Sequence, residues 1–450
     1  MSFPRYPKYK ESGVEWLGQV PEHWEVKRLR FVCDVNPPKS ETSALDSDTV
    51  VSFLPMDAIG EDGSISLEQE KTLKEVQTGY TYFREGDVTM AKITPCFENG
   101  KGAIMRGLTN GIGFGTTELI VARPNVQKTT SRFIQYLFAS PVFRLLGEAH
   151  MYGAGGQKRV PDDFLREYRT GLPPLVEQAA IGDFLDRETA KIDELIAEQE
   201  RLIELLKEKR QAVISHAVTK GLNPDAPMKD SGIEWIGQVP AHWEAGPLKR
   251  YWSVTDCKHV TAEFIDGGIP LASIREVQSR WVDLDNAKCT TEHFYDLLIE
   301  GNRLPMPGDL IFSRNATVGE VAQVHSAHPR FAMGQDVVLL RKISQKHSSD
   351  YLQYTMRSPI IVHQLANLMI GSTFKRINVE EIRSLQVPSP SGNEQSEIAS
   401  FLEIEVSRFD TLTTEAQRAI TLLQERRSAL ISAAVTGQID VRGIQLKEAA

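Results

Sequence analysis

Apolar residues recur in alternating steps of three and four along two long stretches of the chain. This spacing is typical of helices that pack through one stripe, as in a coiled coil. Each helix would cover about 40 residues, roughly 60 Å at 1.5 Å per residue. We therefore expect two long antiparallel helices, within residues 177–220 and 394–450, whose seam consists of Leu185, Ile192, Leu195, Leu202, Leu206, Val213, Leu402, Phe409, Leu412, Leu423 and Leu430.

Alternatively, each helix could pack only on its own domain as a core element. The length of the pattern argues against this, because helices of globular proteins average about 11–12 residues. A paired rod would hold two domains at a fixed separation.

The regions between the helices have a different pattern. Short β-rich runs are broken by glycine and proline turns, which indicates strands. We expect α+β domains at residues 1–176 and 221–393, with strands at Asp87–Ala91, Glu118–Ala122 and Asp336–Leu340 and helices at Phe133–Leu146 and Tyr351–Leu368.

The chain repeats itself. Lys10–Leu29 matches Lys229–Leu248 at an offset of 219 residues, and Glu177–Thr219 matches Glu394–Thr436 at an offset of 217. Two copies of one unit predict an internal pseudo-twofold axis. Residues 36–155 and 253–370 show only a loose correspondence in sequence. A duplicated frame with two divergent inserts suggests two readers of different targets.

Four tryptophans belong to the repeated frame. Residues that are identical in both copies are poor candidates for reading two different targets. We expect anchors that pack each domain onto the helix ends or a partner, namely Trp16, Trp24, Trp235 and Trp243.

The net charge of −9 does not exclude nucleic-acid binding, because the two helical stretches carry −4 and −3 of it. A near-neutral domain can still gather cations on one face for phosphate. No run of about 18 apolar residues is present. The four cysteines lack metal-ligand spacing, which indicates reduced thiols. We expect a cytoplasmic protein without a membrane segment.

The sequence contains no convincing catalytic motif. Asn36-Pro37-Pro38-Lys39 has lysine where DNA amino-methyltransferases place a stacking aromatic residue. The glycine-rich run before Lys158 lacks the spacing of a phosphate-binding loop. Asp162-Asp163 after Pro161 fits a helix start better than a nuclease site. We expect no catalytic residue, no metal ligand and no cofactor bound by this chain.

Two phrases before the long helices carry a resemblance to a known family. They read LPPLVEQAAIGDFLD at Leu172–Asp186 and VPSPSGNEQSEIASFLE at Val387–Glu403. With the order of two variable regions and two helices, they resemble the specificity subunit of type I restriction-modification systems. Similar proteins carry a Gly/Ser-rich turn with a basic pair before each phrase, matched here by residues 155–159 and 371–376.

The resemblance implies a non-catalytic subunit that reads double-stranded DNA. Each variable region would be a target-recognition domain for one half of a bipartite, asymmetric sequence, and the helices would fix the spacer. Two methylation subunits would bring S-adenosylmethionine. Two restriction and translocation subunits would supply the ATP- and Mg²⁺-dependent nuclease.

Candidate DNA contacts follow from this role. Basic pairs beside flexible turns suit phosphate, and cations or asparagines after matched strands suit guanine or adenine in the major groove. The candidates are Lys158, Arg159, Lys375 and Arg376 for phosphate, and Lys92, Asn99, Lys101, Arg314 and Asn315 for bases.

Two other functions remain open. The chain could be a duplicated scaffold or adaptor that binds proteins and does not read DNA. It could also be a stand-alone DNA methyltransferase, which would need a methyl-donor site. The target sequence cannot be derived, because side-chain identity without groove geometry gives no base code.

Overall fold

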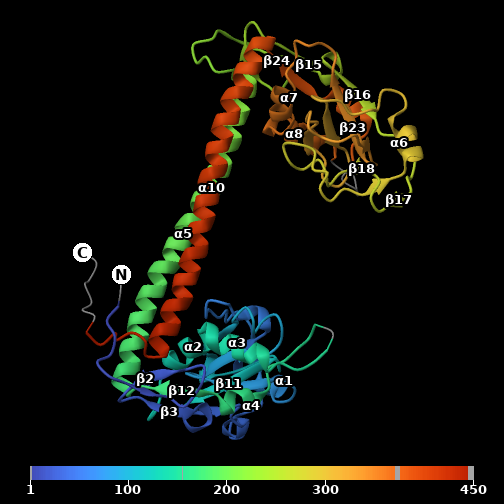
Figure 1. Cartoon of the computed structure of the whole chain (residues 1–450). Coiled ribbons are helices and arrows are strands. Elements are labelled where there is room, and N and C mark those ends of the chain that lie inside the picture. Colours follow the sequence, from blue (N-terminus) through green and yellow to red (C-terminus); the bar gives the residue numbers. More distant parts are fainter. Residues whose placement is uncertain (1–2, 155, 370–375, 444–450) are drawn as a thin grey trace. The chain divides into compact units, whose positions relative to one another are not determined.

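The computed structural model describes residues 3–154, 156–369 and 376–443. Its contacts divide the chain into two compact units, residues 1–199 with 418–450 and residues 200–417. Both boundaries fall inside the long helices α5 (Leu175–Lys220) and α10 (Gly392–Val435), so each unit has one α+β domain and part of both helices (Figure 1). The predicted fold class, two α+β domains and two long helices, is confirmed.

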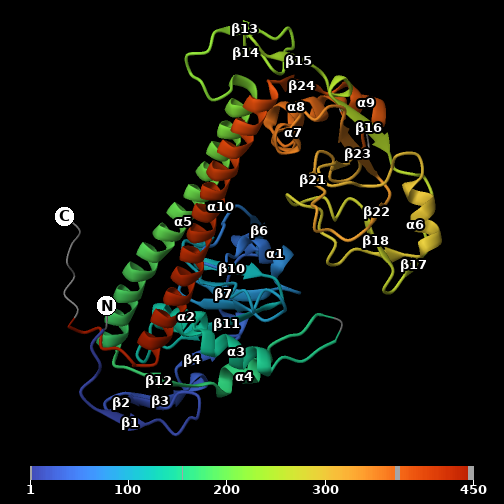
Figure 2. The ribbon, with the colours of Figure 1, turned by 45° about the horizontal axis from the view of Figure 1, so that its top comes forward.

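The domain of the first unit contains two four-stranded sheets (Figure 2). One has the order β6-β5-β10-β7 and the other β4-β11-β8-β9. Two-stranded ribbons β1-β2 and β3-β12 complete it. The strands are β1 Tyr9–Glu11, β2 Gln19–Pro21, β3 Glu25–Arg28, β4 Cys33–Val35, β5 Val50–Leu54, β6 Glu70–Thr72, β7 Thr81–Arg84, β8 Val88–Ala91, β9 Gly102–Ile104, β10 Ile112–Gly115, β11 Leu119–Pro124 and β12 Arg169–Leu172; the helices are α1 Leu73–Val76, α2 Ser131–Ala139, α3 Pro141–Ala149 and α4 Asp162–Glu167.

The domain of the second unit repeats this topology in one four-stranded sheet and in only part of the other, and its sequence has diverged. Its sheets have the orders β16-β23-β20-β21 and β17-β19-β18-β22, and its ribbons are β13-β14 and β15-β24. The strands are β13 Met228–Asp230, β14 Gln238–Pro240, β15 Glu244–Pro247, β16 Trp252–Asp256, β17 Phe264–Ile265, β18 Ile269–Ala272, β19 Cys289–Thr290, β20 Leu310–Ser313, β21 Val321–Gln323, β22 Ala332–Met333, β23 Val337–Lys342 and β24 Gln386–Ser389; the helices are α6 Glu292–Ile299, α7 Ser349–Met356, α8 Pro359–Leu368 and α9 Val379–Ser384.

A buried ion pair holds the same two strands together in each domain. Asp87, directly before β8, accepts hydrogen bonds of 2.8 Å from Arg123 of β11 at both oxygens. Asp309, directly before β20, is held in the same way by Arg341 of β23. Both aspartates are almost fully buried. A buried carboxylate is tolerated only with such a partner, which explains the matched Gly-Asp pairs in the two variable regions.

The structure corrects the predicted helices of both domains. Each expected helix is two helices, α2 and α3 in the first domain and α7 and α8 in the second. The breaks fall before Pro141 and Pro359, which lack the N–H that a continuous helix needs. Ser140 caps the new start, since its hydroxyl accepts from the backbone N–H of Phe143.

Two ion pairs link α5 to α10, one in each unit, and their partners follow opposite orders along the two helices, as in an antiparallel pair. In the first unit Arg427 Nε donates to Asp193 Oδ1 at 2.8 Å. In the second, Arg210 Nε lies 3.5 Å from Asp410 Oδ1. The 217-residue offset carries Asp193 onto Asp410 and Arg210 onto Arg427. The two ion pairs therefore occupy equivalent positions of the internal repeat.

The seam between the helices differs in part from the prediction. Buried positions are Ile181, Leu185, Ile192, Ile203, Leu206 and Ile214 on α5, and Leu402, Phe409, Ala416, Ile420 and Leu430 on α10, with Val213 and Leu423 partly buried. The prediction placed Leu195, Leu202 and Leu412 there, but they are 42–47% exposed. Alternating steps of three and four also fit a seam that starts one residue earlier, which is the seam that includes these three leucines. Only the packing of the two helices decides which of the two sets is buried.

We expect the Asp193–Arg427 pair to contribute to the antiparallel register. The variant Arg427→Asp should lower the free energy of unfolding by about 1 kcal/mol or less, because the pair is partly exposed. The double variant Asp193→Arg, Arg427→Asp should restore most of this loss. Urea denaturation of both single variants and the double variant measures the coupling. A double variant no more stable than the sum of its singles would contradict the pairing.

Candidate nucleic-acid interface

A buried glutamate fixes the first domain to the start of α5. Glu177 Oε1 accepts hydrogen bonds from Tyr6 Oη at 2.6 Å and from Trp24 Nε1 at 2.9 Å. Its Oε2 lies 2.7 Å from His23 Nε2. Trp24 is fully buried in a core that also contains the end of α10. The indole therefore anchors the domain to both helices.

The second unit repeats this arrangement. Trp243 Nε1 donates to Glu394 Oε1 at 3.1 Å, and His242 Nε2 lies 2.8 Å from the same oxygen. Burial alone would raise the pKa of Glu394, but hydrogen bonds from His242, Trp243 and Ser391 outweigh it and hold this pKa below its usual value. Trp243 is buried, whereas Trp235 is 42% exposed. Trp16 packs against Tyr168 with the ring centroids 4.9 Å apart and the rings tilted by 31°.

The glutamine after each glutamate forms a second link, which the sequence analysis missed. Gln178 Oε1 accepts from Thr129 Oγ1, and its Nε2 donates to the carbonyls of Lys128 and Pro173. Gln395 Oε1 accepts from the backbone N–H of Ser348. Both side chains thus tie the domain to the first turn of a long helix. The identity of the Glu-Gln pair in the two copies was the available signal.

Three of the predicted DNA contacts lie in the connection between β8 and β9. Lys92 directly follows β8 and is partly exposed. Asn99 is exposed and donates to Glu61 Oε1 at 2.8 Å, while Lys101 Nζ donates to the carbonyl of Met56 at 3.2 Å. The structure therefore brings these three side chains onto one loop of the first domain.

The residues that flank the glycine-rich run pair with each other beside that loop. They are Tyr152 and Arg159, and Thr94 contacts the same segment through Lys158 N and Gly156 O. Lys158 is exposed. Arg159 instead donates to both oxygens of Glu118, at 2.7 and 2.9 Å, and these bonds hold the pKa of Glu118 below its usual range. Lys158 is therefore better placed than Arg159 to meet a phosphate.

The second domain corrects one of the predicted base contacts. The side chain of Arg314 is only 6% exposed and lies 3.5 Å from Asp256 Oδ1, so its guanidinium does not reach the surface. It directly follows the buried strand β20, which carries it inward. Asn315 Nδ2 donates to Asp336, and Arg376 lies 3.6 Å from the same carboxylate. Lys375 lies outside the described residues.

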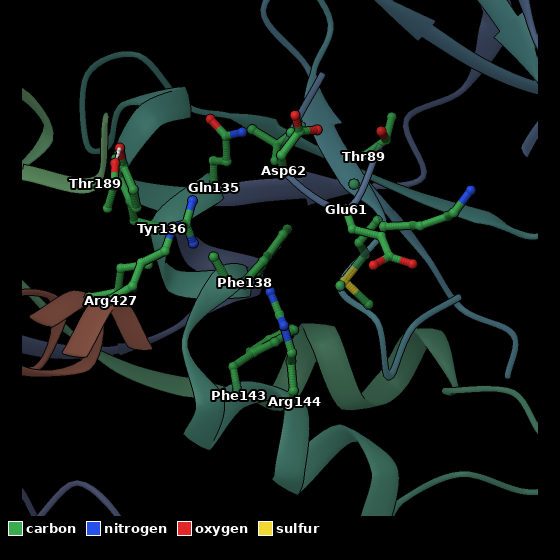
Figure 3. A pocket seen from close by; sticks show the side chains of 18 of the residues that line it. Glu61, Asp62, Thr89, Gln135, Tyr136, Phe138, Phe143, Arg144, Thr189 and Arg427 are labelled. Atoms are coloured by element: carbon green, nitrogen blue, oxygen red, sulfur yellow. Dashed lines mark hydrogen bonds between the residues drawn. The ribbon is translucent and has the colours of Figure 1, made fainter. Parts of the chain in front are cut away.

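A cavity of about 300 Å³ lies in the first unit between the domain and the helix pair (Figure 3). Its wall includes Gln135 and Tyr136 of α2, Arg144 of α3 and Arg427 of α10. Tyr136 Oη donates to Asp186 Oδ1 at 2.6 Å, and burial together with this bond raises the pKa of Tyr136. Arg132 also bonds Asp186. These bonds hold α2 of the domain against α5 at one edge of the cavity.

One flank of the helix pair carries exposed leucines. Three of them directly precede a seam position, and the other two, Leu195 and Leu412, precede the partly buried Ile196 and Thr413, so the leucines share one side of their helix. In an antiparallel pair these two sides adjoin. The acids Asp186, Asp193 and Asp410 instead directly follow seam positions and lie on the opposite flank. The exposed leucines are Leu195 and Leu422 in the first unit and Leu202, Leu205 and Leu412 in the second.

Among residues 3–154, 156–369 and 376–443, no group of three or more His, Cys, Asp or Glu side chains could hold a metal ion. Of the helices in the same ranges, none combines the length and apolarity that crossing a membrane requires. The positioned side chains are anchors, cations and exposed leucines. The geometry suits binding and assembly.

The fold and this interface define a duplicated recognition protein, in which two divergent domains are fixed in the same way to one helix pair. The sequence model described as "Type I restriction modification DNA specificity domain" matches residues 21–205 and 268–422. The chain belongs to this family.

Curated relatives match to different extents. The EcoAI type I restriction enzyme specificity subunit of Escherichia coli is 46% identical over 165 residues, which cover 36% of this chain and 27% of that protein. The EcoEI specificity subunit of the same species is 42% identical over 39% of this chain and 29% of that protein. The putative MjaX specificity subunit of Methanocaldococcus jannaschii is 22% identical over 96% of this chain and 98% of its own length.

Two solved structures share the fold. One chain, from work on complex assembly and conformational transition of the type I R-M system, has a TM-score of 0.72 at 18% identity, with 95% of this chain and 99% of that chain covered. The HsdS subunit from Thermoanaerobacter tengcongensis has a TM-score of 0.57 at 18% identity, with coverage of 93% and 98%. The fold is therefore that of these chains.

Proposed function

We propose that this chain is the non-catalytic DNA-reading subunit of a type I restriction-modification complex. Each domain reads one half of a bipartite, asymmetric target in double-stranded DNA. The observation that carries this function is the repeated frame: one four-stranded sheet of the same topology and the same Trp-Glu anchor present two divergent sets of loops. A frame that is kept while its loops diverge is what two readers of different half-sites require.

Three lysines and one asparagine of the first domain are the proposed contacts. Lys92, Asn99 and Lys101 share one loop, and Lys158 lies next to it, where its backbone N–H donates to Thr94. Lysines bind phosphate as point charges, and asparagine suits adenine. In the second domain Asn315 and Arg376 are the remaining described candidates. Such a reader would act in the cytoplasm, on the DNA of the cell.

The leucine flank supports the proposed partners. Leu195 and Leu412 correspond under the 217-residue offset, as do Leu205 and Leu422. Each unit thus presents an equivalent apolar patch, which suits two copies of one partner. We propose that these partners are the methylation subunits, and that restriction subunits join them. S-adenosylmethionine, ATP and Mg²⁺ would bind those subunits and not this chain.

The test is methylome sequencing of a host that carries this chain with its methylation subunit. Residues 36–161 are exchanged for the same region of a relative, which keeps Tyr6, His23 and Trp24 against Glu177. We expect modified adenines in a split motif and a change in one half only.

An exchange of residues 258–376 is the matched control and should change the other half alone. If no motif appears although the methylation subunit is active, the chain is an adaptor that does not read DNA. Methylation by the purified chain without a partner would instead indicate a stand-alone methyltransferase.

A further inference from the structure

A surface pocket of the first domain has a strongly basic wall. It has a volume of about 600 Å³ and lies at the β3-β12 ribbon, which Figure 1 shows at the outer side of the domain. Among the described residues, its wall includes four cations and no carboxylate; the cations are Lys27, Arg28, Lys128 and Arg169. A pocket of one charge sign attracts a partner of the opposite sign.

Two of the wall cations have carboxylate partners outside the pocket. Lys27 pairs with Glu25 of the same strand. Arg28 Nη1 lies 3.2 Å from Glu167 Oε2, but Arg30 pairs with the same carboxylate. One negative charge is therefore shared between two arginines. All of these pairs are partly exposed, so each contributes little to stability and an incoming anion can compete for the cations.

The other two wall cations, Lys128 and Arg169, have no carboxylate partner in the part of the chain that the structure describes. Lys128 Nζ donates to the backbone carbonyl of Phe31 at 2.9 Å. The side chain of Arg169 forms neither a hydrogen bond nor an ion pair with any described residue. Arg169 stands directly opposite Arg28 in the ribbon, and like charges at opposite positions destabilise a strand pair. An anionic partner would relieve this repulsion.

An exposed aromatic ring lies among these cations. Phe31 lines the pocket and is 54% exposed. The guanidinium of Arg30 lies 5.1 Å from the centroid of its ring, and Lys128 holds the backbone of the same residue. The ring thus offers an apolar contact between positive charges. The pocket suits a partner that carries acidic groups next to an apolar one.

The second domain repeats the ribbon but not this surface. Arg28 corresponds to Pro247 and Arg169 to Gln386 under the offsets of the repeat. Pro247 and Gln386 stand opposite each other in β15-β24, as the two arginines do in β3-β12. The ribbon is kept while its cations are lost. A partner of this pocket therefore binds once per chain, whereas a ligand that meets both domains alike would require two such surfaces.

We propose that the pocket binds one acidic segment of a protein partner, with carboxylates on Arg169 and Lys128 and an apolar side chain on Phe31. Guanidinium groups bind carboxylates through strong, often bidentate hydrogen bonds. Duplex DNA fits less well, because proteins contact it mainly through phosphates and sugars, which leaves the ring without an apolar partner. This binding does not depend on whether the chain reads DNA.

The test titrates the purified full chain into a fluorescein-labelled peptide in which two glutamates alternate with one leucine, followed by fluorescence anisotropy. We expect one peptide per chain. Arg169→Glu should weaken binding about tenfold or more, because it reverses a charge on the wall. Arg166→Glu is the matched control, since Arg166 is an exposed arginine that pairs with Asp163 and is not part of the wall. Equal losses for both variants, or no binding by the unmodified chain, would overturn the proposal.

Phe31→Ala tests the apolar contact. It should weaken binding of the leucine-containing peptide about threefold or more and leave binding of a polyglutamate peptide unchanged. Equal effects on both peptides would overturn the role of the ring. Far-ultraviolet circular dichroism verifies that each variant is folded.

The same variants are titrated with labelled double-stranded and single-stranded oligonucleotides. We expect Arg169→Glu and Arg166→Glu to affect oligonucleotide binding alike, because neither removes a dedicated nucleic-acid contact. If Arg169→Glu selectively weakens binding of an oligonucleotide but not of the peptide, the pocket is a nucleic-acid site and the proposal of an acidic protein segment is wrong.

Discussion

Replacing Trp24 by alanine is expected to lower the free energy of unfolding of the first unit by about 3–5 kcal/mol. Trp24 is fully buried, and its indole packs with the start of α5 and the end of α10. The substitution opens a cavity in this core and also removes one of the donors to Glu177 Oε1. An acceptor that loses a donor inside the protein adds to the cost.

Urea denaturation followed by far-ultraviolet circular dichroism measures this loss without relying on tryptophan fluorescence. Trp235→Ala is the matched control, because Trp235 belongs to the same repeated frame but is 42% exposed. It should cost about 1 kcal/mol or less. Similar losses for both variants would show that burial against the helices is not what makes Trp24 an anchor.

A glutamate in place of Leu205 or Leu422 is expected to remove one methylation subunit each, and the double variant should bind none. These leucines are 52% and 55% exposed and correspond under the repeat. A carboxylate buried against an apolar partner has no counterion, so each affinity should fall by at least about 2 kcal/mol, roughly 30-fold. The chain itself should stay folded.

Native mass spectrometry of the chain mixed with its methylation subunit counts the bound copies. Leu145→Glu is the matched control, since Leu145 is an exposed leucine on α3 of the first domain and belongs to neither long helix. It should leave two copies bound. If Leu205→Glu and Leu422→Glu also leave two copies bound, the leucine flank is not the docking surface.

The sequence by itself determined the duplicated architecture. Two blocks that match at almost one offset require two equivalent surroundings, and the structure contains them as one Trp-Glu anchor in each unit. The predicted β-rich runs form the strands Val88–Ala91, Leu119–Pro124 and Val337–Lys342. Short apolar segments between turns are buried, and pairing in a sheet is one of few ways to satisfy the hydrogen bonds of their backbone.

Only the tertiary structure decided the phase of the helix seam and the fate of each cation. Leu195 and Leu202 satisfy the heptad spacing as well as buried residues do, and packing alone turns them outward. The sequence gives no partner for Arg314 and Arg159, but in the structure Arg314 forms an ion pair with Asp256 and Arg159 with Glu118. Their partners come from distant segments, and the free energy of an arginine depends on which charges the fold brings within a few ångströms.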